Sequence, residues 1–333
     1  MRQFSIDCPL TRCLLAITLA TASAAAGAQA WVPQKNVEIV AASAPGGSND
    51  NTARMLERIL AANKLVPATI TVVNKPGGGA MIANTYVSQR AGDPHYLLIA
   101  GTGIASNHIL GASPLTVADF TPIASLMNDY ALFAVNANSS IKTGKDLADR
   151  LKSDPRSVIV GFANAFGSTR HIAAGLLIKA LGGNPRELKP VVFKGSAEAI
   201  TAMLGAHLDL VVVGAGNAVV HVGTGRMRVL AIAAPQRLGG PLAGAPTFRE
   251  QGIDLVHGSQ RGIYGPKGLT PAQVAYWENT LRKVSETPDW KADLEKYYWA
   301  DDFATGAKFR KEIEQDYAAT KVVLTDLGLA KSP

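Results

Sequence analysis

The chain has 333 residues, of which 47% are hydrophobic and 18% are charged. This length is more than one hydrophobic core usually spans, so two lobes are expected. The net charge of +7 suits nucleic acid, an anionic membrane or acidic small ligands as partners, or it simply keeps the protein soluble. The lysines and arginines form no basic run and no aromatic residues interleave with them, which argues against nucleic acid.

The N-terminal thirty residues have the pattern of a secretory signal peptide. Arg2 and Arg12 precede an apolar run at residues 13–26, and Ala28-Gln29-Ala30 forms an A-x-A cleavage site before Trp31. The run is too short and too rich in Ala, Ser and Thr for a membrane-spanning helix. We therefore expect cleavage after residue 30 and a soluble product in the periplasm.

Both cysteines, Cys8 and Cys13, lie within this predicted signal peptide. The mature chain would then have no disulfide, no thiolate nucleophile and no cysteine-based metal site. Removal of Arg2, Arg12 and Asp7 lowers the net charge from +7 to +6. The mature protein therefore stays basic.

From residue 36 onward, short β-branched runs alternate with helical patterns, which predicts βαβ units and largely parallel sheets covered by helices. The expected strands lie at residues 37–42, 70–73, 96–100, 132–135, 158–161, 190–193, 210–213, 229–233 and 262–266. Early helices are expected at 51–63 and 82–89, and two late ones follow Thr270 and surround Phe309. A loop at residues 235–246 looks like a return crossing. The sequence thus predicts an α/β fold, with residues 31–128 and 250–333 in one lobe and 129–249 in the other.

Several strand-to-helix turns carry glycines and hydroxyl residues, at positions 45–50, 77–79, 167–171 and 194–197. Glycine permits close backbone approach, and the unpaired N–H groups of the following helix offer partial positive charge to an anion. Such turns lie at the carboxyl ends of parallel strands, where ligands bind. Turns from both lobes would form a cradle for a carboxylate, although Ser48, Ser168 or Ser196 could each simply cap its helix.

Three side chains near these turns have two interpretations each. Arg170 lies in the first turn of a predicted helix, an unfavourable place for a cation, so a bound anion would stabilise it; otherwise it faces solvent. His171 is either a ligand contact or a core and capping residue. Arg261 either reaches the space between the lobes or pairs at the surface.

Catalytic motifs are not evident in the sequence. The segments beginning at Gly101 and Gly214 lack the third glycine of a dinucleotide fingerprint, and there is no Walker A lysine motif or G-x-S-x-G elbow. The six histidines show no close pairing of the kind that binds metal. From these absences we expect no cofactor, no metal and no catalysis. The alternative, a hydrolytic enzyme, would need a general base, and Asp50 and His171 are the only candidates for that role.

Several blocks resemble the Bug (TctC-type) family of tripartite tricarboxylate transporter substrate-binding proteins. They are VEIVAASAPGGSND at 37–50, VVNKPGGG at 72–79, DFTPIA at 119–124, FKGS at 193–196 and GIYGPKG at 262–268. The resemblance implies a type II periplasmic binding protein whose two βα lobes, joined by a hinge, close on a small carboxylate in the cleft between them. It also implies delivery of the ligand to the membrane subunits of a tripartite transporter, and we expect a monomer.

In that family the first loop and the Gly-Ser-x-x-His turn hold a ligand carboxylate, which maps onto residues 44–50 and 167–171. Two segments depart from the family pattern, at 92–96 (GDPHY) and 211–217 (VVVGAGN). The second would give an apolar, glycine-lined wall that suits a longer or aromatic acid as well as a compact di- or tricarboxylate, so the ligand can be aliphatic or aromatic. A role as the ligand-sensing subunit of a membrane sensor also stays open.

The predicted ligand-binding residues are taken from these turns and from two further strand ends. They are Ala44, Pro45, Gly46, Gly47, Ser48, Asp50, Gly101, Thr102, Gly167, Ser168, Thr169, Arg170, His171, Lys194, Gly195, Ser196, Ala215 and Asn217.

Overall fold

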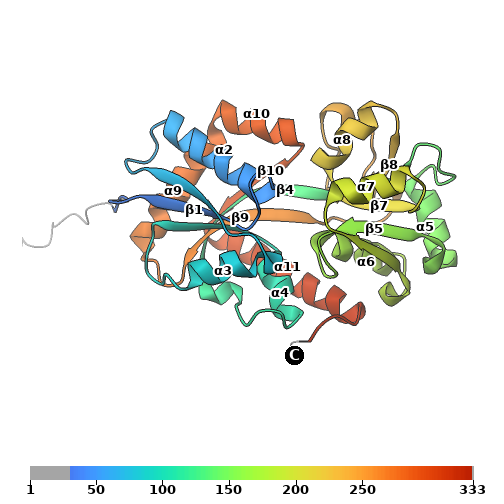
Figure 1. Ribbon diagram of the computed structural model, residues 1–333, viewed down its shortest axis with the longest axis horizontal. Coiled ribbons are helices and arrows are strands. Elements are labelled where there is room, and N and C mark those ends of the chain that lie inside the picture. The colour runs from blue at the N-terminus through green and yellow to red at the C-terminus, as the bar shows by residue number, and fades with distance from the viewer. Residues whose placement is uncertain (1–30, 332–333) are drawn as a thin grey trace, which may run out of the picture.

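The computed structural model describes residues 31–331, so the predicted signal peptide lies outside the described residues. Two lobes lie side by side along the long axis, and strands β4 (Phe120–Asn136) and β9 (Gly258–Pro266) run between them (Figure 1). The ten strands of the described residues join in one sheet, with the main order β2-β1-β3-β9-β4-β7-β5-β6.

The first lobe contains both ends of the described chain. Its remaining strands are β1 (Val37–Ala41), β2 (Ile70–Asn74), β3 (Tyr96–Ala100) and β10 (Ala300–Thr305). Strand β1 pairs in parallel with β2 and β3, whereas β9 pairs antiparallel with β3 and β4. Its helices are α2 (Ser48–Ala62), α3 (Met81–Ser88), α4 (Gly103–Ile109), α9 (Pro271–Glu286), α10 (Pro288–Tyr297) and α11 (Gly306–Asp326).

The second lobe repeats the βα pattern. Its strands are β5 (Ile159–Ala163), β6 (Lys189–Phe193), β7 (Leu210–Gly214) and β8 (Met227–Ile232), and its helices are α5 (Gly144–Ser153), α6 (Thr169–Ala180), α7 (Ser196–Leu204) and α8 (Ala215–Gly223). Strand β5 is parallel to β6 and β7. The strand-to-helix turns therefore lie at the carboxyl ends of strands in both lobes, as the sequence predicts.

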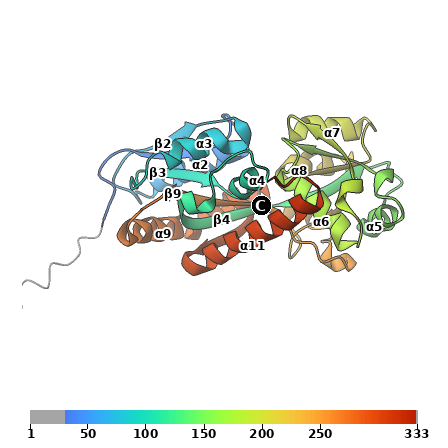
Figure 2. The same ribbon diagram turned by 90° about the horizontal axis from the view of Figure 1, so that it is seen from below.

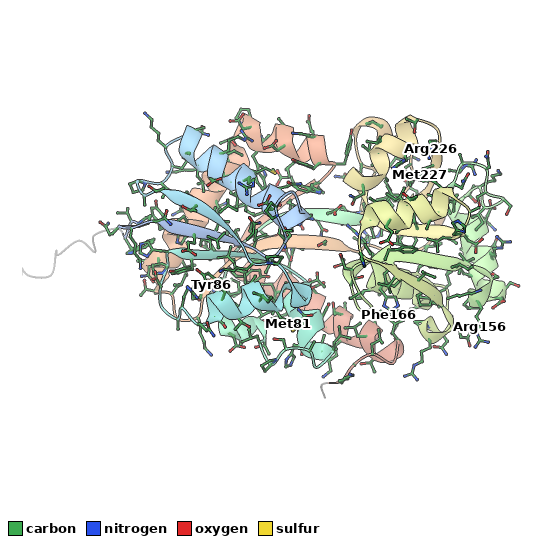
Figure 3. All side chains as sticks on the ribbon, viewed as in Figure 1. Met81, Tyr86, Arg156, Phe166, Arg226 and Met227 are labelled. Carbon is green, nitrogen blue, oxygen red and sulfur yellow. The ribbon has the colours of Figure 1, made fainter. Side chains whose placement is uncertain are left out.

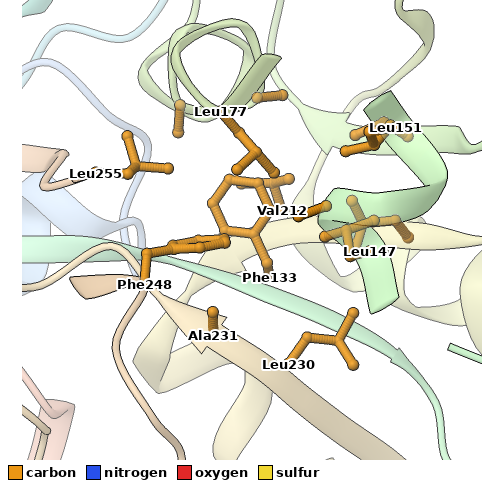
Figure 4. Packing of buried hydrophobic residues seen from close by; sticks show 14 of the residues in the cluster. Phe133, Leu147, Leu151, Leu177, Val212, Leu230, Ala231, Phe248 and Leu255 are labelled. Atoms are coloured by element: carbon orange, nitrogen blue, oxygen red, sulfur yellow. The ribbon is translucent and has the colours of Figure 1, made fainter. Parts of the chain in front are cut away.

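Strand β4 belongs to both lobes. Its residues up to Tyr130 pair with β9, and from Ala131 onward they pair with β7 and β8. Because side chains alternate along a strand, Phe133 packs in one core of the second lobe and Leu132 in the core on the opposite face. The Phe133 and Phe248 rings meet edge to face, with centroids 4.9 Å apart (Figure 4).

A third contact joins the lobes besides the two crossing strands. Helix α11 packs with α4 of the first lobe and α6 of the second through Ile109, Ile172, Val323 and Leu324. Arg186 of the second lobe donates from Nε to the carbonyl of Asp326, at 3.0 Å. Figure 2 shows α11 extending beneath both lobes, so one side of the space between them is covered.

The predicted α/β fold of two βα lobes is confirmed, and each predicted strand coincides with an observed one. Strand β4 is much longer than the predicted 132–135, and β10, α4 and α10 were not predicted. The lobe boundaries at 129 and 250 stay a prediction. Ile253 and Leu255 pack in the same core cluster as Phe133 and Phe248.

Two glycines that flank Thr102 allow a test of the approach between β3 and β9. A methyl group on Gly101 would lie 1.9 Å from the carbonyl oxygen of Gln260, whereas one on Gly103 would meet nothing within 4 Å. We expect Gly101→Ala to lower the free energy of unfolding by about 3 kcal/mol. Gly103→Ala, the matched control, should change it by less than about 1 kcal/mol. Urea unfolding checks this, and equal effects would contradict the close approach.

Candidate functional site

A cluster of three charged side chains lies where the two lobes meet. Asp129, on β4, accepts from Arg170 of helix α6, with 2.6 Å between Oδ2 and Nη2. The same Oδ2 lies 3.6 Å from Nη2 of Arg261, which is on β9. Nη1 of Arg170 also donates to the Asp129 carbonyl, at 3.0 Å. Arg170 of the second lobe and Arg261 of β9 thus both lie against one carboxylate oxygen of Asp129 on β4.

This cluster is buried and carries an excess of one positive charge. Asp129 is 7% exposed and Arg261 is 5% exposed. Burial lowers the pKa of Arg261 to about 10; Asp129 raises it and Arg170 lowers it further. Arg261 is therefore charged at neutral pH, and two guanidinium groups face one carboxylate. A buried charge without a partner is costly, so the site favours an additional anion.

The other contacts of Arg261 are uncharged and lead to the first lobe. Its Nη2 donates to Oγ of Ser48, the first residue of helix α2. Nη1 lies 3.4 Å from Sδ of Met127, and the guanidinium lies 4.6 Å from the centre of the Trp299 ring. The N-termini of α2 and α6, which both carry partial positive charge, are thereby linked through the cluster.

The N-terminus of helix α8 also reaches the cluster. A methyl group on Gly214, which precedes α8, would lie 2.5 Å from Oδ2 of Asp129 and 2.9 Å from Nη2 of Arg170. The predicted ligand residue Ala215 follows it and is fully buried. Only glycine fits at position 214 without moving the ion pair.

Three of the predicted turns are held by the same kind of hydrogen bond. In each of them a side chain in the first turn of the helix accepts the backbone N–H of the residue four positions earlier: Asp50 from Gly46 at 2.8 Å, His171 from Gly167 at 2.9 Å, and Glu198 from Lys194 at 3.1 Å. These acceptors hold the turns in shape at the starts of helices α2, α6 and α7.

Asp50 is 1% exposed and is saturated by donors of its own lobe. Besides Gly46, it accepts from Nδ2 of Asn74 at 2.8 Å and from Nε of Arg54 at 3.0 Å. Burial alone would raise the pKa of Asp50, but these three donors outweigh it and lower the pKa below its ordinary value. Asp50 therefore holds the first loop and is not poised as a general base.

His171 has a similar supporting role. It is 3% exposed and stacks on Phe162, with ring centroids 4.7 Å apart. Burial lowers the pKa of His171 to about 4, so the ring is neutral and its Nδ1 is free to accept from Gly167. Of its two sequence interpretations, the structure favours the core and capping role.

The turn at 167–171 lies against the first lobe. A methyl group on Gly167 would come within 2.8 Å of the Leu110 side chain, at the end of α4. Phe166, which precedes it, is 49% exposed on the side of the second lobe toward the first (Figure 3). By contrast, Lys194 is exposed, and a methyl group on Gly195 would meet nothing within 4 Å. The ligand-binding roles of all the residues predicted from the sequence stay predictions, including those of the turn at 194–196 and of Gly101, Thr102 and Asn217.

The opposite face of β4 and β9 carries acidic groups. A cavity of about 360 Å³ is lined there by Asn128, Tyr130, Val256, His257, Gly258, Gln260, Asp302, Glu312, Gln315 and Asp316. Burial raises the pKa of Asp316 to about 6, and burial with the neighbouring Asp302 raises that of Glu312. Because neighbouring residues of a strand point to opposite faces, an anion is favoured only on the face of the arginines.

Asp129 was not among the predicted site residues. It follows no turn or motif, yet it is the only charged residue in the strand from Phe120 to Asn136. A lone charge in an apolar strand needs a partner when it is buried, and this signal could have found it. The sequence left Arg261 either between the lobes or at the surface, and in the structure it is a buried partner of Asp129.

Comparisons with known proteins give the family and the fold of this chain. The family model described as "Tripartite tricarboxylate transporter family receptor" (TctC) matches residues 53–329. The chain belongs to the TctC family. Its similarity to Protein BugT of Bordetella pertussis is 26% identity over 297 residues, covering 86% of this chain and 88% of that protein.

Two solved structures share the TctC fold. A TctC solute-binding protein from Polaromonas is 27% identical, covers 89% of this chain and 99% of its own, and has a TM-score of 0.76. Rpa4515 of R. palustris, solved with adipate, is 23% identical, covers 90% and 99%, and has a TM-score of 0.74. The type II periplasmic binding fold is thereby confirmed, in a family of periplasmic solute-binding proteins. Within residues 31–331, no helix of this TctC protein has the length and apolar character to cross a membrane.

The buried His171 ring predicts a pH-dependent stability. An unfolded chain titrates its histidines near pH 6.5, whereas the pKa of folded His171 is about 4. Between these values the unfolded state binds more protons, so stability falls as the pH drops. At pH 7, His171→Asn should be less stable than the wild type, and this difference should shrink by about 3 kcal/mol toward pH 4.

Urea unfolding of both proteins across this pH range measures the difference. His207→Asn, at an exposed position, is the matched control and should keep a constant difference from the wild type. A pH-independent difference for His171→Asn would show that the ring is not buried in its neutral form.

Proposed function

We propose that the mature protein is a periplasmic receptor that binds a small carboxylate between its lobes and delivers it to a tripartite tricarboxylate-type transporter. The observation that carries this proposal is the buried excess of positive charge formed by Arg170 and Arg261 around Asp129. A ligand carboxylate there would neutralise the cluster and accept charge-assisted hydrogen bonds.

The carboxylate would interact with both lobes at once. Arg170 is the first-turn cation of α6, and Arg261 contacts Ser48 at the start of α2. The N–H groups of both helix starts add donors, while Asp50 and His171 keep the two turns in shape. A ligand that bridges these groups binds the closed form more tightly than the open form, and so drives closure.

The rest of the ligand would face the start of α8. Gly214, Ala215 and Gly216, at this helix start, bring no polar side chain. This wall suits the carbon chain of an aliphatic or aromatic acid. The dicarboxylate adipate in a relative of the same fold agrees with this chemistry.

The remaining parts of the proposal follow from the sequence and the family. Export by the N-terminal signal would place the protein in the periplasm as a monomer. The membrane subunits of the transporter would be its partners, a proposal that the family description supports. We further propose that the lobes divide near residue 129 and after Leu255.

A thermal-shift screen of the mature protein tests the binding function. The compounds would be mono-, di-, tri- and aromatic carboxylates together with sugars and cationic amines. A ligand of the native state stabilises it by about 2.7 kcal/mol at a concentration of 100 Kd, so a carboxylate should raise the melting temperature. Shifts from sugars or amines alone would overturn the proposal.

The variant Arg261→Gln tests the place of binding. Loss of one cation should weaken binding of the best carboxylate from the screen by about 10- to 100-fold, because charge-assisted hydrogen bonds contribute about 1.5–3 kcal/mol. The unliganded variant should melt no lower than the wild type, since Asp129 and Arg170 remain as a neutral pair. Isothermal titration calorimetry and thermal melts measure both effects.

Arg249→Gln is the matched control for this variant. Arg249 pairs with Asp254 at 2.8 Å on the surface of the second lobe, so its loss should leave carboxylate affinity unchanged. Equal affinities for Arg261→Gln and the wild type would exclude the cluster as the binding place.

A further inference from the structure

We infer that Asp129 is a specificity-determining residue: it limits the group bound at the cluster to a single negative charge, such as a carboxylate, and rejects doubly charged groups such as sulfate. This inference rests on the proposed function, because it concerns the same site. It adds a residue and a selection rule that anion binding alone does not require.

Asp129 is fixed in place by the fold. It lies in the middle of β4, opposite Ser259 of β9, and its own carbonyl also accepts from Arg170. The Gly214 backbone lies against its carboxylate. Its Oδ1 is buried and has no hydrogen-bond partner among the described residues, so the two guanidinium groups are the charged partners of the carboxylate.

The count of charges then determines which group fits. The contacts of Arg170 are the Asp129 carboxylate and carbonyl. Those of Arg261, besides Asp129, are Ser48, Met127 and Trp299, which are all uncharged. Two cations and one anion leave a charge of +1. One further negative charge balances these side chains, whereas two would leave them with a net negative charge in a buried place, offset only by the partial charges of the helix N-termini.

The acidic cavity on the other face of β4 and β9 strengthens this selection. Asp302, Glu312 and Asp316 line it, so a second negative charge on the ligand group would be repelled across the sheet.

A purely positioning role for Asp129 makes a different prediction. If the carboxylate only oriented the guanidinium groups, its removal would weaken the binding of singly and doubly charged anions alike. If it sets the charge, its removal raises the cluster from +1 to +2 and shifts the preference toward doubly charged anions. The ratio of the two affinities therefore distinguishes these roles.

The experiment compares acetate with sulfate by the saturable rise in melting temperature at constant ionic strength. The response of Arg261→Gln serves as the baseline for general salt effects, since sulfate stabilises most proteins without binding. The wild type should prefer acetate. The isosteric variant Asp129→Asn should shift the ratio of apparent affinities toward sulfate by about tenfold or more. An unchanged ratio would overturn the inference.

A second pair of variants does not depend on the folding of the single variant Asp129→Asn. Arg170→Gln leaves Asp129 with Arg261, a cluster of zero charge, and should lose the acetate response. The double variant Asp129→Asn/Arg170→Gln leaves Arg261 alone, again +1, and should regain it. If acetate binding does not return, Asp129 does not set the charge.

The two proposals fail in different ways. If carboxylates in the screen stabilise the wild type but the ratio of acetate to sulfate is the same with and without Asp129, the charge rule is wrong and the receptor function stands. If no carboxylate stabilises the wild type, the proposed function itself fails.

Discussion

The pairing of Asp129 with Arg170 and Arg261 imposes the main constraint on this structure. Charged groups can be buried between two lobes only if each stays within reach of its partner, so the strands that carry them must hold a fixed register. Strand β4 meets this need by running unbroken from one lobe into the other. The same need explains the glycines at positions 101 and 214. A side chain at Gly101 would displace the crossing strand β9, and one at Gly214 would displace the ion pair.

The alternation of side chains along β4 and β9 separates charge across the sheet. Met127, Asp129 and Arg261 share one face, and Asn128, Tyr130 and Gln260 share the other with the carboxylates of β10 and α11. Burial raises the pKa of Tyr130 to about 12, and Asp302 and Glu312 act in the same direction. An anion that approaches the lobes therefore meets attraction on one face only. Helix α11 covers the other face (Figure 2).

The sequence allowed the βα order and the glycine-containing turns at the strand ends to be predicted, because both are local patterns of β-branched runs and glycines. Strand β4 was predicted too short, since Pro122, Ser125 and Asn128 interrupt its apolar run. Asp50 and His171 each accept the backbone N–H of the glycine four residues earlier. This spacing can be recognised in the sequence once the hydrogen bond is known. The pairing of Asp129 with two arginines 41 and 132 residues away could not be predicted, because it depends on how the lobes are placed.

The apolar contact among α4, α6 and α11 has a consequence for how the protein responds to temperature. Separation of the lobes on that side would expose Ile109, Ile172 and Leu324 to water. Exposure of apolar surface increases the heat capacity, and the free-energy cost of exposing it falls on cooling. If the lobes open and close as the proposed function requires, cooling would shift the unliganded protein toward the open form and warming would shift it toward the closed form.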